Sequence, residues 1–331
     1  MTQKQRRISF RDALNEALRQ EMLRDESVIV IGEDVGIYGG LFGVTRGLFK
    51  EFGPKRVIDT PISEAGFLGA SCTLAATGWR PVVELFYVDF LAVCMDQLWN
   101  NIAKMRYQSA GKMRIPLVMT ASCGVGTFES YQHSQVLYST IAQIPGIKVV
   151  IPSNAYDAKG LLVSSIRDDD PVVFLEHKSL LKSSVEENVP VEEYSIPLGK
   201  ASVRRAGNDV TVVAMMLMVN RALEVAKELE KDGISVEVID PRTIVPFDKE
   251  TILESLKKTG RLVIVDESHE RCGMASQIAA IAAEEAFEYL KAPIRRVASL
   301  NVPIPYMQSQ IDYVIPTQAK ILEAVKRTYK T

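Results

Sequence analysis

The stretch RVIDTPISEAGFLGASCTLAATG, residues 56–78, places a helix of small residues directly after the end of a short strand. Residues 56–59 have the character of a strand end, and the alanine-rich run after Glu64 stops at Gly78, a residue that commonly ends helices. Glu64 stands in the first turn of this helix, where a carboxylate complements the positive end of the helix dipole. The stretch therefore predicts a strand–loop–helix unit with a carboxylate at the carboxyl end of the strand.

Further strand–loop–helix segments stand before and after this stretch. Ser9 and Asn154 stand where helices begin and are suitable N-caps. Apolar strands that alternate with helices indicate a mostly parallel sheet covered on both faces, the doubly wound α/β class. The predicted strands are residues 27–34, 56–60, 80–88, 115–122, 147–153 and 171–177, and the predicted helices are residues 9–23, 44–53, 64–77, 90–109, 134–144 and 154–168.

A polar segment interrupts this alternation after residue 178. Residues 178–200 contain Pro190 and Pro197 and show no sustained periodicity, which is typical of a linker. A second α/β alternation then follows and ends in an amphipathic helix at residues 316–330. The sequence therefore predicts a first domain over residues 1–178, a linker over residues 179–206 and a second domain over residues 207–331.

Composition narrows the class of protein. The 331 residues are 47% hydrophobic and carry a formal net charge of −2, which gives no electrostatic reason to expect nucleic acid or an anionic membrane as partner. The four cysteines form no CxxC pair and no Cys/His cluster, so neither a disulfide framework nor a zinc site is expected. The basic N-terminal stretch lacks the apolar core of a signal peptide, and no apolar run approaches the length of a membrane span. A cytoplasmic protein is expected.

Three short motifs fall at predicted carboxyl ends of strands. They are Glu64 in DTPISEAGF, Phe90 at the end of ELFYVDF and His133 in YQHSQ. In an open α/β sheet these ends and the loops that leave them form the ligand crevice. A carboxylate, an aromatic ring and a histidine suit a flat heteroaromatic cofactor. Walker A, GxSxG and HExxH motifs are absent from the sequence, and so is a glycine-rich dinucleotide loop after a strand.

Seven segments stand in order along the chain: GEDVGIYGG, FGVTRGL, RVIDTPISEAGFLG, DFLAVCMDQLWNNIAKMRY, HSQ, PGIKVVIPSNAYDAKGLL and DPVVFLE. Together with IDPRTIVPFD and VPIPY in the second half, they resemble the beta subunits of thiamine diphosphate-dependent 2-oxo acid dehydrogenases. The resemblance covers nearly the whole chain. It implies a pyrimidine-binding domain followed by a transketolase C-terminal-type domain. The family's alpha subunit supplies the half of the site that binds the diphosphate and magnesium, through a GDG motif. This motif is absent from the present sequence, as expected for a beta chain.

The resemblance assigns roles to four side chains. Glu64 matches the glutamate that hydrogen-bonds the aminopyrimidine ring nitrogen and favours the imino tautomer, which removes the proton from the thiazolium carbon. Phe90 matches the aromatic residue that stacks on the aminopyrimidine, and Phe86 is a second expected contact of the cofactor pocket. His133 matches the active-site histidine, expected to orient the substrate or to donate a proton as the acyl group passes to the lipoyl group.

Each role has a simpler alternative. Glu64 complements the helix dipole in any case, Phe90 is equally suited to an ordinary core, and a lone histidine is more often structural. The resemblance favours the functional interpretation for these residues, whereas His177 and His269 are expected to be structural.

Family relatives also hold a potassium ion in this subunit. The matching positions are Leu117, Ser165, Asp168 and Asp170, whose oxygens suit a hard cation. The alternative is a helix C-terminus followed by solvated acids, and no spacing rule separates the two.

The family implies partners and a substrate class. An alpha subunit in a two-alpha, two-beta heterotetramer and a lipoylated dihydrolipoyl acyltransferase core are expected, with a pyruvate-like 2-oxo acid or acetoin as substrate. HSQVLY and DESHERCGMASQIAA favour the acetoin branch, while Thr120 stands where many relatives carry arginine. Two alternatives remain at this stage: half of a split transketolase-like enzyme, and a non-catalytic scaffold that docks an acyltransferase core.

Overall fold

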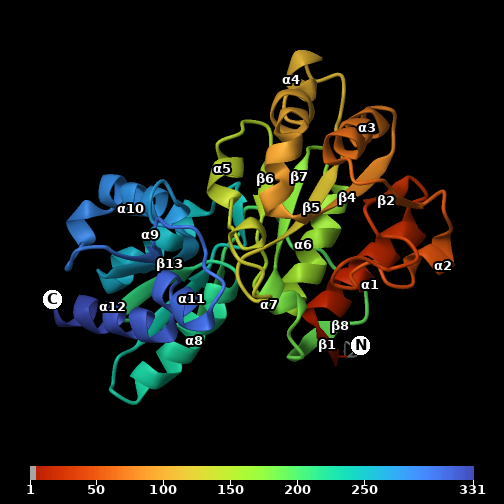
Figure 1. The fold of residues 1–331 in the computed structure, drawn as a ribbon. Helices are drawn as coiled ribbons and strands as arrows, with labels where there is room; N and C mark the ends of the chain where they lie inside the picture. Colours follow the sequence, from red (N-terminus) through yellow and green to blue (C-terminus); the bar gives the residue numbers. More distant parts are fainter. Residues whose placement is uncertain (1–4) are drawn as a thin grey trace. The chain divides into compact units, whose positions relative to one another are not determined.

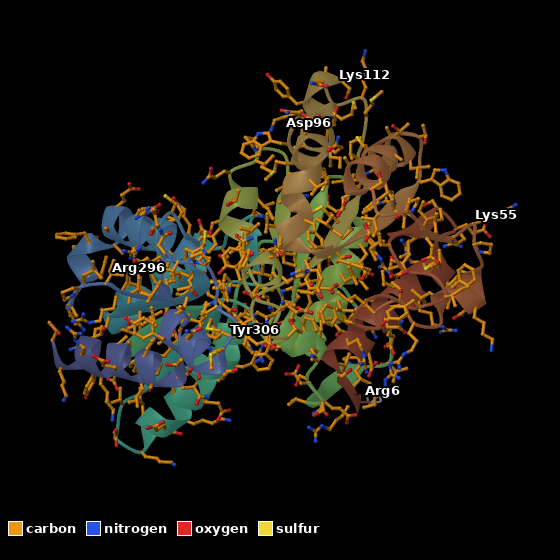
Figure 2. All side chains as sticks on the ribbon, viewed as in Figure 1. Arg6, Lys55, Asp96, Lys112, Arg296 and Tyr306 are labelled. Atoms are coloured by element: carbon orange, nitrogen blue, oxygen red, sulfur yellow. The ribbon has the colours of Figure 1, made fainter. Side chains whose placement is uncertain are left out.

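A computed structural model describes residues 5–331, so the first four residues of the basic N-terminal stretch lie outside the described part. The chain divides into two compact units, which are drawn as a ribbon in Figure 1 and with their side chains in Figure 2. The first unit comprises Met1–Gly126 and Thr140–Leu198, and the second comprises Thr127–Ser139 and Gly199–Thr331. Within residues 5–331, no helix is both long and apolar enough to cross a membrane.

A parallel sheet forms the centre of the first unit. Its strands neighbour one another in the order β6–β7–β5–β4–β2–β3. Every residue of β2, β5 and β7 is buried, so both faces of the sheet are covered, as the apolar runs in the sequence predicted. The strands are β2 (Val28–Gly32), β3 (Val57–Asp59), β4 (Arg80–Tyr87), β5 (Val118–Cys123), β6 (Lys148–Val150) and β7 (Val172–His177).

The helices of this unit begin where the sequence placed their caps. The Ser9 side chain accepts a hydrogen bond from the Asp12 amide at the start of α1 (Phe10–Arg24), and Asn154 does the same for Asp157 at the start of α6 (Ala155–Arg167). Helices α1 and α6 lie side by side (Figure 1). The short α2 (Leu48–Phe52) follows Gly47, and α3 (Glu64–Ala76) packs on β4.

The long helix predicted over residues 90–109 is broken into three short pieces. These are the 3₁₀ helix η1 (Val88–Cys94), the π-helical η2 (Gln97–Ile102) and α4 (Met105–Gln108). The side chain of Asn100 donates to the Asp96 carboxylate at 2.7 Å, and that of Asn101 donates to the Asp96 carbonyl at 3.3 Å. Such side-chain bonds compete with regular helical bonds, which the apolar periodicity alone does not reveal.

The predicted helix over residues 134–144 also differs from the structure. Its helical part, α5, covers only Tyr138–Ala142, and a separate 3₁₀ turn, η3, covers Tyr131–His133. Ser134 and Val136 are buried, so the segment packs against the protein without helical geometry.

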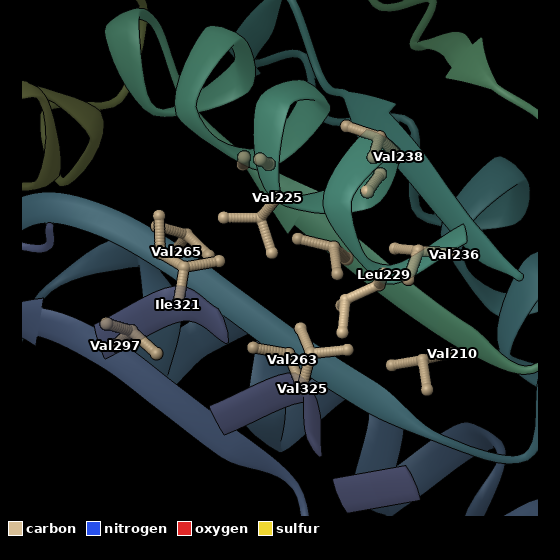
Figure 3. Packing of buried hydrophobic residues seen from close by; sticks show 14 of the residues in the cluster. Val210, Val225, Leu229, Val236, Val238, Val263, Val265, Val297, Ile321 and Val325 are labelled. Carbon is tan, nitrogen blue, oxygen red and sulfur yellow. The ribbon is translucent and has the colours of Figure 1, made fainter. Parts of the chain in front are cut away.

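The second unit contains a five-stranded sheet in the order β14–β13–β10–β11–β9, parallel except for β9 at its edge. Its core packs α8 and α12 on the sheet through valine, leucine and isoleucine side chains (Figure 3). The strands are β9 (Ser202–Arg205), β10 (Val210–Ala214), β11 (Val236–Asp240), β13 (Leu262–His269) and β14 (Arg295–Ser299), while β12 is the short Thr243–Val245. The helices are α8 (Leu217–Glu230), α9 (Lys249–Thr259), α10 (Met274–Glu285), η4 (Phe287–Tyr289), α11 (Gln308–Val314) and α12 (Gln318–Lys330).

The segment predicted as a linker, residues 179–206, contains a short helical end and two strands. It contains most of α7 (Lys178–Leu181), and its strand β8 (Glu186–Pro190) pairs antiparallel with β1 (Gln5–Ser9). Strand β9 belongs to the sheet of the second unit. The boundary between the units therefore falls at Leu198, inside the predicted linker. Long-range strand pairing stabilises a segment whose own sequence lacks periodicity.

Candidate cofactor and catalytic site

Glu64 is the first residue of α3 and lies beyond the carboxyl end of β3, where the sequence placed it. The neighbouring parallel strand β2 ends just before Glu33. Burial, and then the negative charge of Glu64, raise the pKa of Glu33. Burial together with the Glu64 charge also raises the pKa of the Cys94 thiol to about 12. Glu64 therefore belongs to a group of close ionisable side chains at the carboxyl edge of the sheet.

Glu33 is the member of this group that the sequence analysis missed. Its Oε1 atom is buried and has no hydrogen-bond partner within residues 5–331. A buried acceptor without a partner lowers folding stability by about 1–3 kcal/mol, and in native structures such an atom often marks the binding site of a ligand, ion or water. Two adjacent carboxylates, one with an unsatisfied oxygen, fit a ring that presents N–H donors. The letters GED directly after the buried strand β2 were the available signal.

Phe86 and Phe90 lie in the same unit, where β4 leads into η1. The pairing of β4 with β5 is irregular between Glu84 and Tyr87, and Phe86 has a φ of +58°. A positive φ at a bulky residue is rare and is concentrated at functional sites. Phe90 contacts Tyr87 edge to face, with ring centroids 5.7 Å apart. Both phenylalanines are only partly buried, so neither is an ordinary core residue.

His133 belongs to a different unit from Glu64. It ends the 3₁₀ turn η3, inside the segment Thr127–Ser139 that belongs to the second unit. The imidazole is partly exposed. The structure therefore groups Glu64, Phe86 and Phe90 in the first unit and assigns His133 to the second.

The two other histidines have structural contacts, as expected. His177 is 1% exposed, and its Nδ1 accepts a hydrogen bond from the Ser179 amide at 3.1 Å. His269 Nδ1 lies 2.8 Å from the carbonyl oxygen of Leu300, so this nitrogen carries the proton.

The residues expected to hold potassium already have other partners. The Leu117 carbonyl accepts the Val172 amide at 2.9 Å, and the Ser165 hydroxyl donates to the Leu161 carbonyl at 2.7 Å. Asp168 and Asp170 contact the basic side chains of Lys148 and Arg106, which reach all four of their carboxylate oxygens. No cluster of three or more metal-ligating side chains occurs in the part of the chain that the structure describes. The two carboxylates are thus shared with basic side chains; potassium binding at these positions stays a prediction, and no step below uses it.

A second group of partly or fully buried ionisable residues lies on the first sheet. Glu84 of β4 and Glu176 of β7 flank β5, and Lys178 follows directly after β7. Glu176 is 6% exposed and Lys178 is fully buried. Burial raises the pKa of Glu84 to about 7, and burial with the nearby Glu84 charge raises that of Glu176. Charged letters within the apolar runs VVELF and VFLEH were the signal for this group.

Glu84→Gln is expected to make the isolated chain more stable at pH 8 and less sensitive to pH. Because the folded pKa of about 7 exceeds the ordinary value of 4.5, the folded chain holds a proton between these values that the unfolded chain lacks. Wild-type stability contributed by this group is therefore present at low pH and is lost as pH rises toward 7, by on the order of 2 kcal/mol. Urea unfolding at pH 5.5 and pH 8 measures the difference.

Glu26→Gln, which changes an exposed carboxylate, is the matched control for this experiment. It should keep the wild-type dependence on pH. If Glu84→Gln also kept that dependence, the Glu84 carboxyl would not be the titrating group.

Two family models cover almost the whole chain. The transketolase pyrimidine binding domain matches residues 6–184, and the transketolase C-terminal domain matches residues 199–321. A split gene transketolase, described as an inactive beta4 tetramer, has the same fold, with a TM-score of 0.78 and 22% identity over 98% of both chains. The first model ends at residue 184 and the second begins at residue 199, directly after the boundary between the structural units at Leu198.

Curated relatives are similar over nearly their full length. The beta subunit of acetoin:2,6-dichlorophenolindophenol oxidoreductase from Bacillus subtilis is 46% identical over 95% of both chains, and the one from Cupriavidus necator is 46% identical over 98% of both. The beta subunit of the pyruvate dehydrogenase E1 component from Staphylococcus epidermidis is 47% identical over 96% of this chain and 97% of that protein. The chain therefore belongs to the transketolase-like family that contains the beta subunits of acetoin and pyruvate dehydrogenases.

Proposed function

We propose that the chain is the catalytic beta subunit of a thiamine diphosphate-dependent dehydrogenase that cleaves acetoin or decarboxylates a pyruvate-like 2-oxo acid. The observation that carries this proposal is the Glu33–Glu64 pair with its unsatisfied buried oxygen, at the carboxyl edge of the sheet in a pyrimidine-binding domain. Relatives of both substrate types are 46–47% identical, so similarity alone does not favour one substrate over the other.

The residues of the first unit fit the aminopyrimidine half of the cofactor. Glu64 would accept a hydrogen bond from the ring nitrogen and hold a proton there, while the free Oε1 of Glu33 would accept from an N–H donor. Phe90 and Phe86, both partly exposed, offer ring faces for stacking. When bound, thiamine diphosphate supplies the carbanion that attacks the substrate carbonyl and takes up the electrons of the broken carbon–carbon bond.

Charge repulsion between Glu33 and Glu64 has a catalytic consequence. The Glu64 charge contributes to the raised pKa of Glu33, so Glu33 takes up a proton more readily than an isolated carboxyl group does. A proton passed from a carboxyl group to a ring nitrogen would leave that carboxyl group one charge more negative, and its return would restore the starting state.

Partners complete the proposed enzyme. The sequence lacks the GDG motif that grips the diphosphate in thiamine enzymes, so we infer that an alpha subunit supplies this half and most of the magnesium ligands. The relatives are themselves named beta subunits. We propose a two-alpha, two-beta heterotetramer that transfers the acyl group to the lipoyl group of an acyltransferase core. The free cysteines, three of them buried, suit the reducing cytoplasm where such an assembly would work.

The purified chain alone is expected to bind thiamine diphosphate weakly and to show no turnover. Addition of a matching alpha subunit should produce tight binding and cofactor-dependent reduction of a dye by acetoin or pyruvate. Calorimetry with magnesium and thiamine diphosphate, before and after addition of the alpha subunit, measures the first effect. The substrate that gives the higher kcat/KM identifies the branch.

Micromolar or tighter binding to the single chain would contradict the shared cofactor site. Ketol transfer between sugar phosphates by the reconstituted complex, without dye or lipoyl reduction, would instead identify a split transketolase. Undiminished turnover after Glu64→Ala would indicate that this carboxylate has no catalytic role.

A further inference from the structure

We propose that Tyr138 and Asp266 are positioning residues that fix the segment carrying His133 onto the second unit. The inference rests on the proposed function, because it assigns to these two residues the task of holding the acyl-transfer histidine. Neither residue was singled out by the sequence, where they lie 128 positions apart.

The first observation is that the segment Thr127–Ser139 needs an anchor. Phe128 has a φ of +57°, and Ser130 has a φ of +63° with a ψ of −160°. Non-glycine residues in such regions cost on the order of 1–3 kcal/mol each and persist only when surrounding contacts impose them. The 3₁₀ turn that ends in His133 follows Ser130 directly. Contacts made elsewhere in the segment therefore contribute to the position of the imidazole.

The second observation is the contact that supplies this anchor. The Tyr138 hydroxyl donates a hydrogen bond to Oδ1 of Asp266, and the two residues are 1% and 0% exposed. The same carboxylate accepts from the Ser268 amide at 2.8 Å and, through Oδ2, from the Ala275 amide at 3.0 Å. Asp266 is thus held rigidly between the end of β13 and the first turn of α10. A buried hydrogen bond to a carboxylate held in this way is among the stronger kinds.

The third observation concerns the residues on either side of His133. Tyr131 and Gln135 line a cavity of about 330 Å³ whose other walls are His269 and residues 301–304. These walls follow the carboxyl ends of the parallel strands β13 and β14, the edge where α/β sheets bind ligands. The exposed Tyr306, 63% accessible, lies on the same loop (Figure 2). The anchored segment therefore forms one wall of an open cavity of its own unit, through the residues two positions before and two positions after His133.

The consequence for chemistry is geometric. A proton donor must lie within about 2.6–3.2 Å of the atom that it serves, and a displacement of about 1 Å can cost a hundredfold in rate. Loss of the Tyr138 hydroxyl would release the C-terminal end of the segment Thr127–Ser139 from Asp266. His133 would then sample positions too far from the group that receives the acyl chain.

Tyr138→Phe tests the anchor with little change in packing, because the ring remains and Asp266 keeps its two amide donors. Tyr194→Phe is the matched control: the Tyr194 hydroxyl donates to the Tyr156 carbonyl at 2.7 Å in the first unit. In the reconstituted complex, Tyr138→Phe should lower lipoyl-dependent turnover about tenfold relative to dye reduction, an effect that local misplacement of His133 would produce. Tyr194→Phe should leave that ratio unchanged.

Two further measurements separate positioning from general destabilisation. Hydrogen exchange of the full chain should accelerate at least about tenfold across residues 128–139 in Tyr138→Phe, with no change in α6, because local opening is governed by local contacts. The double variant Tyr138→Phe/His133→Ala should have the same lipoyl-dependent turnover as His133→Ala alone, since the anchor acts through the histidine.

Unchanged exchange in residues 128–139 would overturn the anchor, whatever the activities show. Equal loss in both assays, or additive losses in the double variant, would overturn the positioning role. A complex in which His133→Ala itself has no effect would refute the acyl-transfer role of His133 and with it the positioning role, while the exchange result still decides the anchor.

Discussion

Glu64→Gln is expected to lower the turnover of the reconstituted complex by about a hundred- to ten-thousand-fold, the usual contribution of a general acid–base group. Glutamine keeps the length of the side chain but cannot hold or release a proton. It also removes the negative charge that contributes to the raised pKa of Glu33, so the pKa of Glu33 should fall. Steady-state dye reduction at saturating thiamine diphosphate measures the loss.

The fold should survive this substitution. Glu64 is only partly buried, and the Ser63 position before it makes no side-chain cap, so the start of α3 depends little on the carboxylate. Melting within about 2 °C of wild type is expected for a change of well under 1 kcal/mol. Glu250→Gln is the matched control, because Glu250 is an exposed first-turn acid of α9. A Glu64→Gln enzyme with more than about half of wild-type turnover would refute the assignment.

His133→Ala is expected to separate two activities of the same complex. Transfer of the acyl group to lipoyl should fall by about a hundredfold or more, as for loss of a general acid. Dye reduction should fall much less, because the dye takes electrons without a lipoyl proton donor. The motivation is that the imidazole is partly exposed and that Tyr131 and Gln135, two positions to either side of it, line an open cavity.

Melting temperature and Michaelis constants complete this test. A structural histidine would lower the melting temperature, and both activities would then decline together. A substrate-orienting histidine would raise the Michaelis constant in both assays without a change in melting. His177→Ala serves as the control, because the buried His177 accepts a hydrogen bond from the Ser179 amide and should affect stability without changing the ratio of the two activities. Equal loss in both assays would refute the acyl-transfer role of His133.

Much of the fold could be predicted because its strands are uniformly apolar. Strands β2, β5 and β7 are buried at every position, and their mostly apolar sequences predict this burial. The caps Ser9 and Asn154 were predictable for a similar reason, since an N-cap bonds an amide within three residues. The broken helix after Val88 was not predictable, because Asp96, Asn100 and Asn101 compete with the backbone only in the folded geometry.

The candidate site was predictable only in part. Glu64, Phe90 and His133 were recognised from short motifs, and the structure places each at a strand end or in the loop after one. Glu33 and Glu84 were missed. Their letters beside or inside apolar runs are visible in the sequence, but the burial that raises their pKa values exists only in the folded chain. Asp168 and Asp170 pair with Lys148 and Arg106, and ion pairs between distant positions leave no trace in spacing.

The sequence by itself determined the α/β class, the order of the two domains and the membership of Glu64 in a conspicuous motif. Those properties are encoded in residue periodicity and in contiguous letters, which act over one element at a time. Only the tertiary structure decided that residues 186–190 and 202–205 pair as strands, that residues 127–139 belong to the second unit, and that Tyr138 meets Asp266. Long-range strand pairing and burial bring distant residues together, and the energies of those contacts depend on desolvation and geometry that no local pattern records.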